Sequence, residues 1–309
     1  MNVLIVGSIG LDTIETPFGV QKDILGGSGV HASVSCSFFS PTALVGLAGE
    51  DFPQEYVDFL TGKGVSTQGL IRQKGARTFR WSGYYEYDMN QAHTRDTQLN
   101  ALARFNPVLS GEQKKMPYVF MANLDPEIQL KVLDQLDSPK LVAADTMDFW
   151  INGKRDALVE VVKRVDLMLL NEGEIRQFMQ TPNIPLAARK MIELGAKAVV
   201  VKKGEHGALF FNSRHFFAVP SYPQESFKDP TGAGDSFAGG LIGYLGKSND
   251  LGEANIRKAL VCGSVMASFN IEDFSLGRLK TLTHKEIHNR FGEFKKFCHF
   301  DELTADLAV

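Results

Sequence analysis

Short, continuous apolar runs recur along the chain and are separated by segments with helical spacing. Such runs are typical of parallel strands buried on both faces, because a strand with one face in water alternates apolar and polar residues. Regular alternation of strand and helix predicts an α/β fold, with a doubly wound, mostly parallel central sheet flanked by helices. We expect strands at residues 2–7, 43–49, 118–123, 140–145, 166–171 and 198–204, and helices at 126–136, 153–164 and 184–195.

Small or polar residues stand where the expected strands end: Gly7, Asn123, Asp145, Asn171 and Gly204. In a doubly wound sheet the carboxyl ends of the parallel strands meet at one edge, and ligands bind in the crevice outside that edge. We therefore expect the functional site to lie there.

One segment, residues 76–99, departs from this alternation and carries aromatic, β-prone residues with polar ones between them. The pattern predicts antiparallel strands that form a small lid beside the main sheet. A solvent-facing hairpin with no role in binding is the alternative. No repeat or Pro-rich linker interrupts the sequence, so we expect a single domain over 1–309, with a lid insertion at about 76–99 to which 12–24 could contribute.

Charge and cysteine content narrow the class of partner. The formal net charge is −3, so there is no basic surplus to displace counterions from a nucleic acid. No apolar run in the sequence approaches the roughly 18 residues that span a bilayer. The 3 cysteines lie far apart without a Cys-x-x-Cys pair, which is typical of reduced thiols. We expect a cytoplasmic protein with neither a nucleic-acid nor a membrane partner.

The stretch "DPTGAGDSFAGGL", residues 229–241, combines four glycines with two aspartates. Glycine permits a tight turn, and the following residues have helical character, so the amides of Gly232, Ala233 and Gly234 should converge at a helix N-terminus. Such amides bind an anion or a developing negative charge. A carboxylate at Asp235 would repel a bound phosphate, but it could take the proton from an attacking hydroxyl in phosphoryl transfer. A helix-entry turn with Asp235 as its cap is the alternative.

A longer string, "DPTGAGDSFAGGLIGYL", closely resembles the C-terminal signature of the ribokinase-like (PfkB) family of sugar and nucleoside kinases. "GGSGVHAS", residues 26–33, resembles the di-glycine half of the N-terminal signature, and "GLAGEDFP" resembles its end. "NEGE", residues 171–174, is similar to the Asn-x-x-Glu element of the family, and "VVVKKGEHGA" to the strand and turn beside the nucleotide. The resemblance covers nearly the whole chain and implies a ribokinase-like fold.

The resemblance also implies a role for individual residues. It makes Asp235 the catalytic base, with Gly232, Ala233 and Gly234 as the anion hole. Residues expected to bind the acceptor substrate are Asp12, Gly26, Gly27, His31 and Trp81. Residues expected to bind the nucleotide are Asn171, Lys202, Gly204, Gly207 and Thr231, and Asn171 and Glu174 would hold Mg²⁺ through water.

Two departures from the family pattern limit what the resemblance implies. His31 stands where the signature usually has Asn, and it could either contact the acceptor or pack within a helix without touching it. Asp229 and Thr231 match positions that line a monovalent-cation site in some members. The later segment "GSVMASFNIEDF" departs from the pattern that completes that site, so a potassium requirement stays open.

Taken together, the resemblance and the motifs predict an ATP- and Mg²⁺-dependent kinase that phosphorylates a hydroxymethyl group of a small sugar. A nucleoside is the alternative acceptor, because aromatic lid residues such as Trp81 could stack on either a sugar or a base. A non-catalytic sensor of sugars or nucleotides is the alternative of a different class. The lid is also a candidate surface for a homodimer.

Overall fold

The computed structural model describes residues 2–301 and contains a nine-stranded sheet of the predicted kind. Seven neighbouring strands are parallel, and two antiparallel strands close one edge. All six predicted strands lie in the parallel part, so the prediction of a doubly wound, mostly parallel sheet is confirmed. In spatial order the strands are β13 (Phe216–Val219), β12 (Ala208–Asn212), β11 (Ala198–Lys202), β10 (Leu167–Asn171), β9 (Leu141–Asp145), β8 (Tyr118–Met121), β1 (Val3–Val6), β4 (Thr42–Gly49) and β5 (Val65–Gln73).

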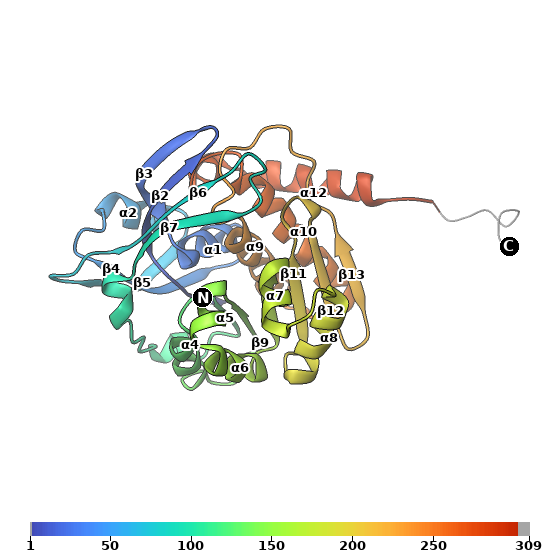
Figure 1. Cartoon of the computed structure of the whole chain (residues 1–309), viewed down its shortest axis with the longest axis horizontal. Coiled ribbons are helices and arrows are strands. Elements are labelled where there is room, and N and C mark those ends of the chain that lie inside the picture. The colour runs from blue at the N-terminus through green and yellow to red at the C-terminus, as the bar shows by residue number, and fades with distance from the viewer. Residues whose placement is uncertain (1, 302–309) are drawn as a thin grey trace, which may run out of the picture.

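Helices cover both faces of this sheet (Figure 1). The apolar cluster on one face includes residues of α1 (Ser28–Ser37), α2 (Gln54–Gly62), α9 (Ala233–Ser248), α10 (Glu253–Asn270), α11 (Gly277–Thr281) and α12 (His284–Cys298). The cluster on the other face includes residues of α4 (Pro126–Leu133), α5 (Asp148–Gly153), α6 (Arg155–Arg164), α7 (Glu172–Met179) and α8 (Ile184–Leu194). Shorter helical turns are η1 (Asn100–Arg104), α3 (Gly111–Lys114) and η2 (Gly204–His206).

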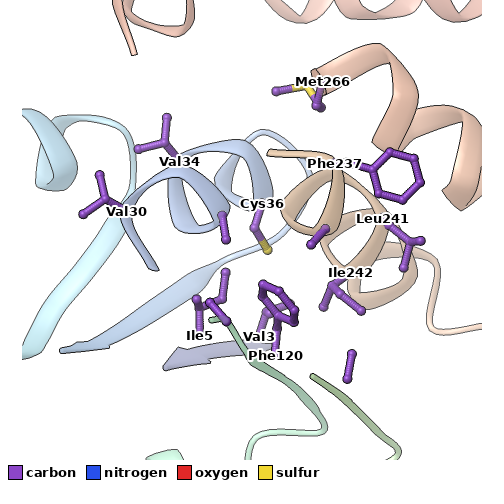
Figure 2. Packing of buried hydrophobic residues seen from close by; sticks show 14 of the residues in the cluster. Val3, Ile5, Val30, Val34, Cys36, Phe120, Phe237, Leu241, Ile242 and Met266 are labelled. Atoms are coloured by element: carbon purple, nitrogen blue, oxygen red, sulfur yellow. The ribbon is translucent and has the colours of Figure 1, made fainter. Parts of the chain in front are cut away.

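The first strand shows why the strands read as continuous apolar runs. Val3 and Ile5 point into the cluster formed with α1 and α9, as Figure 2 shows, whereas Leu4 and Val6 belong to the cluster on the opposite face. All four side chains are fully buried. A strand covered on both sides needs apolar residues at successive positions, because successive side chains point to opposite faces.

A second sheet of four strands, the lid sheet, lies to one side of the main sheet (Figure 1). Its order is β3 (Gly19–Gly26), β2 (Gly10–Thr16), β6 (Phe79–Tyr85) and β7 (Ala92–Gln98). β6 and β7 pair antiparallel, as expected for residues 76–99, but β2 pairs parallel with β6. The lid sheet is therefore built from two segments that are distant in sequence. A homodimer through this sheet stays a prediction.

The position of β1 fixes where the lid sheet stands relative to the main sheet. β1 lies between β4 and β8, so the strand order reverses at this point, which is where doubly wound sheets bind ligands. Three residues separate the end of β1 from the start of β2, which carries the chain from this carboxyl edge into the lid sheet. Within residues 2–301, every helix is too short or too polar to cross a membrane.

Candidate active site

The loop before α9 is shaped by one buried carboxylate. Asp229 is fully buried, and its two oxygens accept hydrogen bonds from the backbone amides of Thr231 (2.8 Å) and Ser275 (3.0 Å). The loop ends at Gly232, whose φ of 75° favours glycine, and α9 begins at the next residue. Within residues 2–301, no side-chain hydrogen bond caps this helix, so its first amides face the carboxyl edge uncapped.

The amides of this loop do not all have the same freedom to bind an anion. The Ala233 amide donates to the Pro230 carbonyl oxygen at 3.1 Å. The predicted anion hole therefore depends chiefly on the amides of Gly232 and Gly234, and a contribution from Ala233 requires its hydrogen bond to be shared. Lys202 adds positive charge at this place, because a Cβ on Gly234 would lie 3.1 Å from its Nζ.

Asp235 lies in the first turn of α9 with a half-buried carboxyl group. Burial is the largest cause that raises its pKa to about 7, the charge of Asp145 raises it further, and the charge of Lys202 lowers it. A carboxyl group with a pKa near 7 can hold a proton and release it again at physiological pH, which suits general-base catalysis.

Asp12, on β2, is the second carboxyl group of the site. It is 5% exposed, and its Oδ1 has no hydrogen-bond partner within residues 2–301. Burial raises its pKa to about 7, the nearby charges of Asp229 and Asp235 raise it further, and a hydrogen bond from the Gly27 backbone opposes this rise. Gly26 is required beside it, because a Cβ there would lie 1.9 Å from Asp12 Oδ2. A buried, unpartnered carboxyl oxygen of this kind is suited to bind hydroxyl groups of a ligand.

Two aromatic residues of β6 lie near Asp12 in the lid sheet. Asp12 pairs in register with Trp81 on β6, and alternation places Trp81 and Tyr85 on the same face of the lid sheet. The Trp81 indole donates to Thr94 Oγ1 at 3.1 Å, and Thr231 Oγ1 donates to the Tyr85 hydroxyl at 3.2 Å. The lid therefore contacts the loop before α9 directly. Tyr85 is one of the lid aromatics that the sequence offered for stacking on an acceptor, but sequence reasoning did not predict its hydrogen bond with Thr231.

The residues predicted to bind the nucleotide lie mainly at the ends of β9, β10 and β11. Lys202 Nζ lies 2.5 Å from Asp145 Oδ2, and the Asp145 side chain is only 3% exposed. Asn171 and Glu174 cap α7 reciprocally, since each side chain accepts from the other residue's backbone amide at 2.8 and 2.7 Å. Burial raises the pKa of Glu174 to about 8, with Lys202 opposing the rise and Asp145 adding to it. A nearby cation would favour the charged carboxylate.

The predicted nucleotide turn lies beside the tip of the lid. Gly204 begins the turn η2 and Gly207 follows it, and Lys203 N donates to the Gly207 carbonyl at 2.8 Å. From the lid, Asn90 Nδ2 donates to Glu205 Oε1 at 2.9 Å. In the described part of the chain, no group of three or more His, Cys, Asp or Glu side chains could hold a metal ion.

His31 lies in α1 and packs against Gly232 of the loop before α9. It is 2% exposed, and burial lowers its pKa to about 4. Nδ1 lies 3.0 Å from Asn270 Oδ1, and a Cβ on Gly232 would lie 2.3 Å from the same nitrogen. The contact of His31 with an acceptor stays a prediction, for which Nε2 is the remaining ring nitrogen. Asn270 was missed by sequence reasoning, which saw its segment only as a departure from the family pattern.

The glycine amides, the ionisable carboxyl groups and the lid together define a site suited to phosphoryl transfer on an α/β fold. The family model of pfkB family carbohydrate kinases matches residues 20–280, and the chain belongs to this family. The predicted family and the prediction of a kinase are confirmed, and the acceptor is a carbohydrate or a nucleoside.

Three known proteins illustrate the similarity. The cytidine kinase of Thermococcus kodakarensis is 28% identical over 263 residues, which cover 82% of this chain and 91% of that protein. The nucleoside kinase of Burkholderia thailandensis, solved in complex with ADP-inosine, has a TM-score of 0.78 at 18% identity and covers 98% of both chains. A candidate ribokinase II of E. coli, solved with ATP and Mg²⁺, has a TM-score of 0.76 at 19% identity and covers 94% of this chain and 99% of that chain.

Proposed function

We propose that this chain is an ATP-dependent nucleoside kinase that phosphorylates the hydroxymethyl group of its acceptor. The observation that carries the proposal is the pair of carboxyl groups, Asp12 and Asp235, which lie close enough for the charge of Asp235 to raise the pKa of Asp12. Asp12 has an oxygen without a hydrogen-bond partner in the described chain that can bind ligand hydroxyls, and Asp235 stands beside the glycine amides. Similarity to a cytidine kinase over most of both chains supports a nucleoside over the free sugar predicted from sequence.

In the proposed reaction the acceptor oxygen attacks the γ-phosphorus of ATP. Asp235 takes the hydroxyl proton as the new oxygen–phosphorus bond forms, and the bond from the γ-phosphorus to the bridging oxygen breaks, so ADP leaves with its electron pair. The amides of Gly232 and Gly234 donate to the transferring phosphoryl group. Because these donors are fixed at the start of α9, they need no reorganisation during the reaction.

Residues at the ends of β10 and β11 are proposed to hold the phosphates of ATP. Lys202 lies next to Gly234 and is anchored by Asp145, so its charge is held beside the anion-binding loop. Asn171 and Glu174 would hold Mg²⁺ through water, because they offer amide and carboxyl oxygens and Asp145 adds negative charge nearby. Mg²⁺, when bound with the nucleotide, neutralises charge on the phosphates.

The lid sheet is proposed to close over the acceptor and exclude water. Its hydrogen bonds with Thr231 and Glu205 connect it to the loop before α9 and to the turn η2. A site that admitted water beside Asp235 would transfer the phosphoryl group to water instead of the acceptor.

A screen of purified protein for ATP-dependent phosphotransfer tests this function. Cytidine and inosine should be phosphorylated with a kcat/KM at least about tenfold above that of free ribose or fructose, because the base adds binding contacts that a free sugar lacks. A preference for the free sugars would instead support the acceptor class predicted from sequence. Nucleotide binding without transfer to any acceptor would support a sensor.

A further inference from the structure

The last residue of α10, Asn270, joins three separate parts of the site from behind. Its side chain is fully buried, and its amide makes three hydrogen bonds. Nδ2 donates to the Thr231 carbonyl at 2.8 Å, while Oδ1 lies 2.9 Å from Ser236 Oγ and 3.0 Å from His31 Nδ1. The partners belong to the loop before α9, to α9 and to α1, so one amide connects all three.

The Thr231 carbonyl fixes the orientation of this amide. A carbonyl oxygen only accepts, so the Asn270 nitrogen must face it and the Asn270 oxygen must face Ser236 and His31. Both of those partners must then donate. His31 therefore carries its proton on Nδ1, and its low pKa of about 4 keeps the ring neutral, which leaves Nε2 as a hydrogen-bond acceptor.

Holding the Thr231 carbonyl also aims an amide of the anion hole. In a trans peptide the C=O of one residue and the N–H of the next point in opposite directions. Because the Thr231 carbonyl points to Asn270, the N–H of Gly232 points away from it. The His31 ring lies behind Gly232 and blocks the loop from collapsing toward α1, since a Cβ on Gly232 would lie 2.3 Å from its Nδ1.

We propose that Asn270 is a positioning residue that aims the Gly232 amide at the transferring phosphoryl group, with His31 and Ser236 fixing its own orientation. The inference rests on the proposed function, because it assigns the Gly232 amide to that group. Asn270 touches no reacting atom and acts through the Thr231–Gly232 peptide. The Gly232 amide is the more important donor to the phosphoryl group, because the Ala233 amide already donates to the Pro230 carbonyl.

Asn270→Asp is the discriminating substitution. It keeps an oxygen for Ser236 and His31 but replaces the donor to the Thr231 carbonyl by a second oxygen, which repels it. Loss of one anion-hole donor costs about 10²–10³ in kcat, so misaiming one should cost about tenfold or more. The acceptor KM should stay within about twofold, because acceptor contacts are unchanged.

Asn255→Asp is the matched control within the same helix. Asn255 is also buried, and its Nδ2 donates to the Asp250 carbonyl and to Ser248 Oγ, each at 2.7 Å. It stands 15 residues earlier in α10, roughly 20 Å from Asn270 along the helix axis. A merely structural role predicts equal losses of stability and of kcat in both variants, whereas positioning predicts a loss of kcat in Asn270→Asp alone.

Two measurements on the full chain need no turnover. Binding of Mg²⁺-ADP with aluminium fluoride, a mimic of the transferring phosphoryl group, should weaken about tenfold in Asn270→Asp, while Mg²⁺-ADP alone should bind as in wild type. Nitrogen NMR of wild type should find the His31 proton on Nδ1 with no titration between about pH 5 and 8.

The outcomes separate the inference from the function. Wild-type phosphotransfer with equal kcat in wild type and Asn270→Asp would overturn the inference and leave the function intact. A His31 proton on Nε2, or unchanged binding of the aluminium fluoride mimic, would overturn it as well. Absence of phosphotransfer to any acceptor would refute the function, and the mimic would still decide whether Asn270 aims the loop.

Discussion

Replacing Asp235 by Asn removes a proton acceptor and a negative charge while keeping nearly the same shape. A general base contributes about 10²–10⁴-fold in rate, so we expect kcat to fall by that factor. ATP affinity should hold or improve, because a negative charge beside the phosphates is lost. Asp137→Asn is the matched control, since the side chain of Asp137 is exposed.

The same substitution should stabilise the fold above neutral pH. A carboxyl group whose pKa rises from 3.8 to about 7 on folding binds its proton more tightly in the folded state. The raised pKa therefore stabilises the folded state by up to ~4 kcal/mol below pH 4, and this contribution is lost as the pH rises through 7. Because the carboxyl group is only half-buried, we expect Asp235→Asn to gain about 1–2 kcal/mol over wild type at pH 8.

Steady-state kinetics and urea unfolding at pH 5 and pH 8 measure both effects. The wild-type kcat/KM should fall below pH 7 as Asp235 takes up a proton, and the gain in stability of the variant should shrink by more than half between pH 8 and pH 5. A variant that lost ATP binding, kcat and stability together at pH 8 would refute the reasoning. Asp235 would then hold the loop in shape, and Asp12 or Asp145 would become the candidate base.

Three further substitutions test other parts of the site. Lys202→Met leaves the buried Asp145 carboxylate unpaired, so the free energy of unfolding should fall by roughly 3 kcal/mol and the ATP KM should rise. A urea unfolding curve identical to that of wild type would refute the pairing. Glu174→Gln can keep its capping hydrogen bond but loses its charge, so activity should need more Mg²⁺; an unchanged Mg²⁺ titration would remove Glu174 from the metal site. Gly26→Ala should raise the acceptor KM at least about tenfold, because the added Cβ displaces the Asp12 carboxyl group. Gly62→Ala is the control and should leave the KM unchanged, since a Cβ there meets nothing within 4 Å in the described chain. Equal acceptor KM values in the two variants would contradict the geometry.

Local pattern predicted the elements of the main sheet because burial on both faces leaves a continuous apolar run. The strands at its edges were not predicted. Polar residues interrupt β5, which is partly exposed, and β12 and β13 are short, partly exposed apolar runs that pair antiparallel. The parallel pairing of β2 with β6 was also beyond the sequence, since a strand's residues do not specify which distant strand becomes its partner.

The same limit applies to the site. Motifs located the glycine loop, Asp235 and the nucleotide side, because each lies within one short segment. Asp12 was found only through the resemblance, and the sequence could not reveal that burial leaves one of its oxygens unpartnered. The hydrogen bond between His31 and Asn270 joins the first and the tenth helix, and no local pattern in either helix predicts the other.

The position of β2 and β3 in the sequence, between β1 and α1, affects how acceptor preference could change in the laboratory or in evolution. Recombination at a single pair of crossover points cannot exchange the whole lid, because half of it lies at residues 10–26 and half at 79–98. A chimera that imports only the later half from a relative must still match β2 residue by residue along the parallel pairing. We expect such chimeras to fold their main sheet and fail at the lid, so that acceptor range in this architecture changes by point substitutions on both halves together.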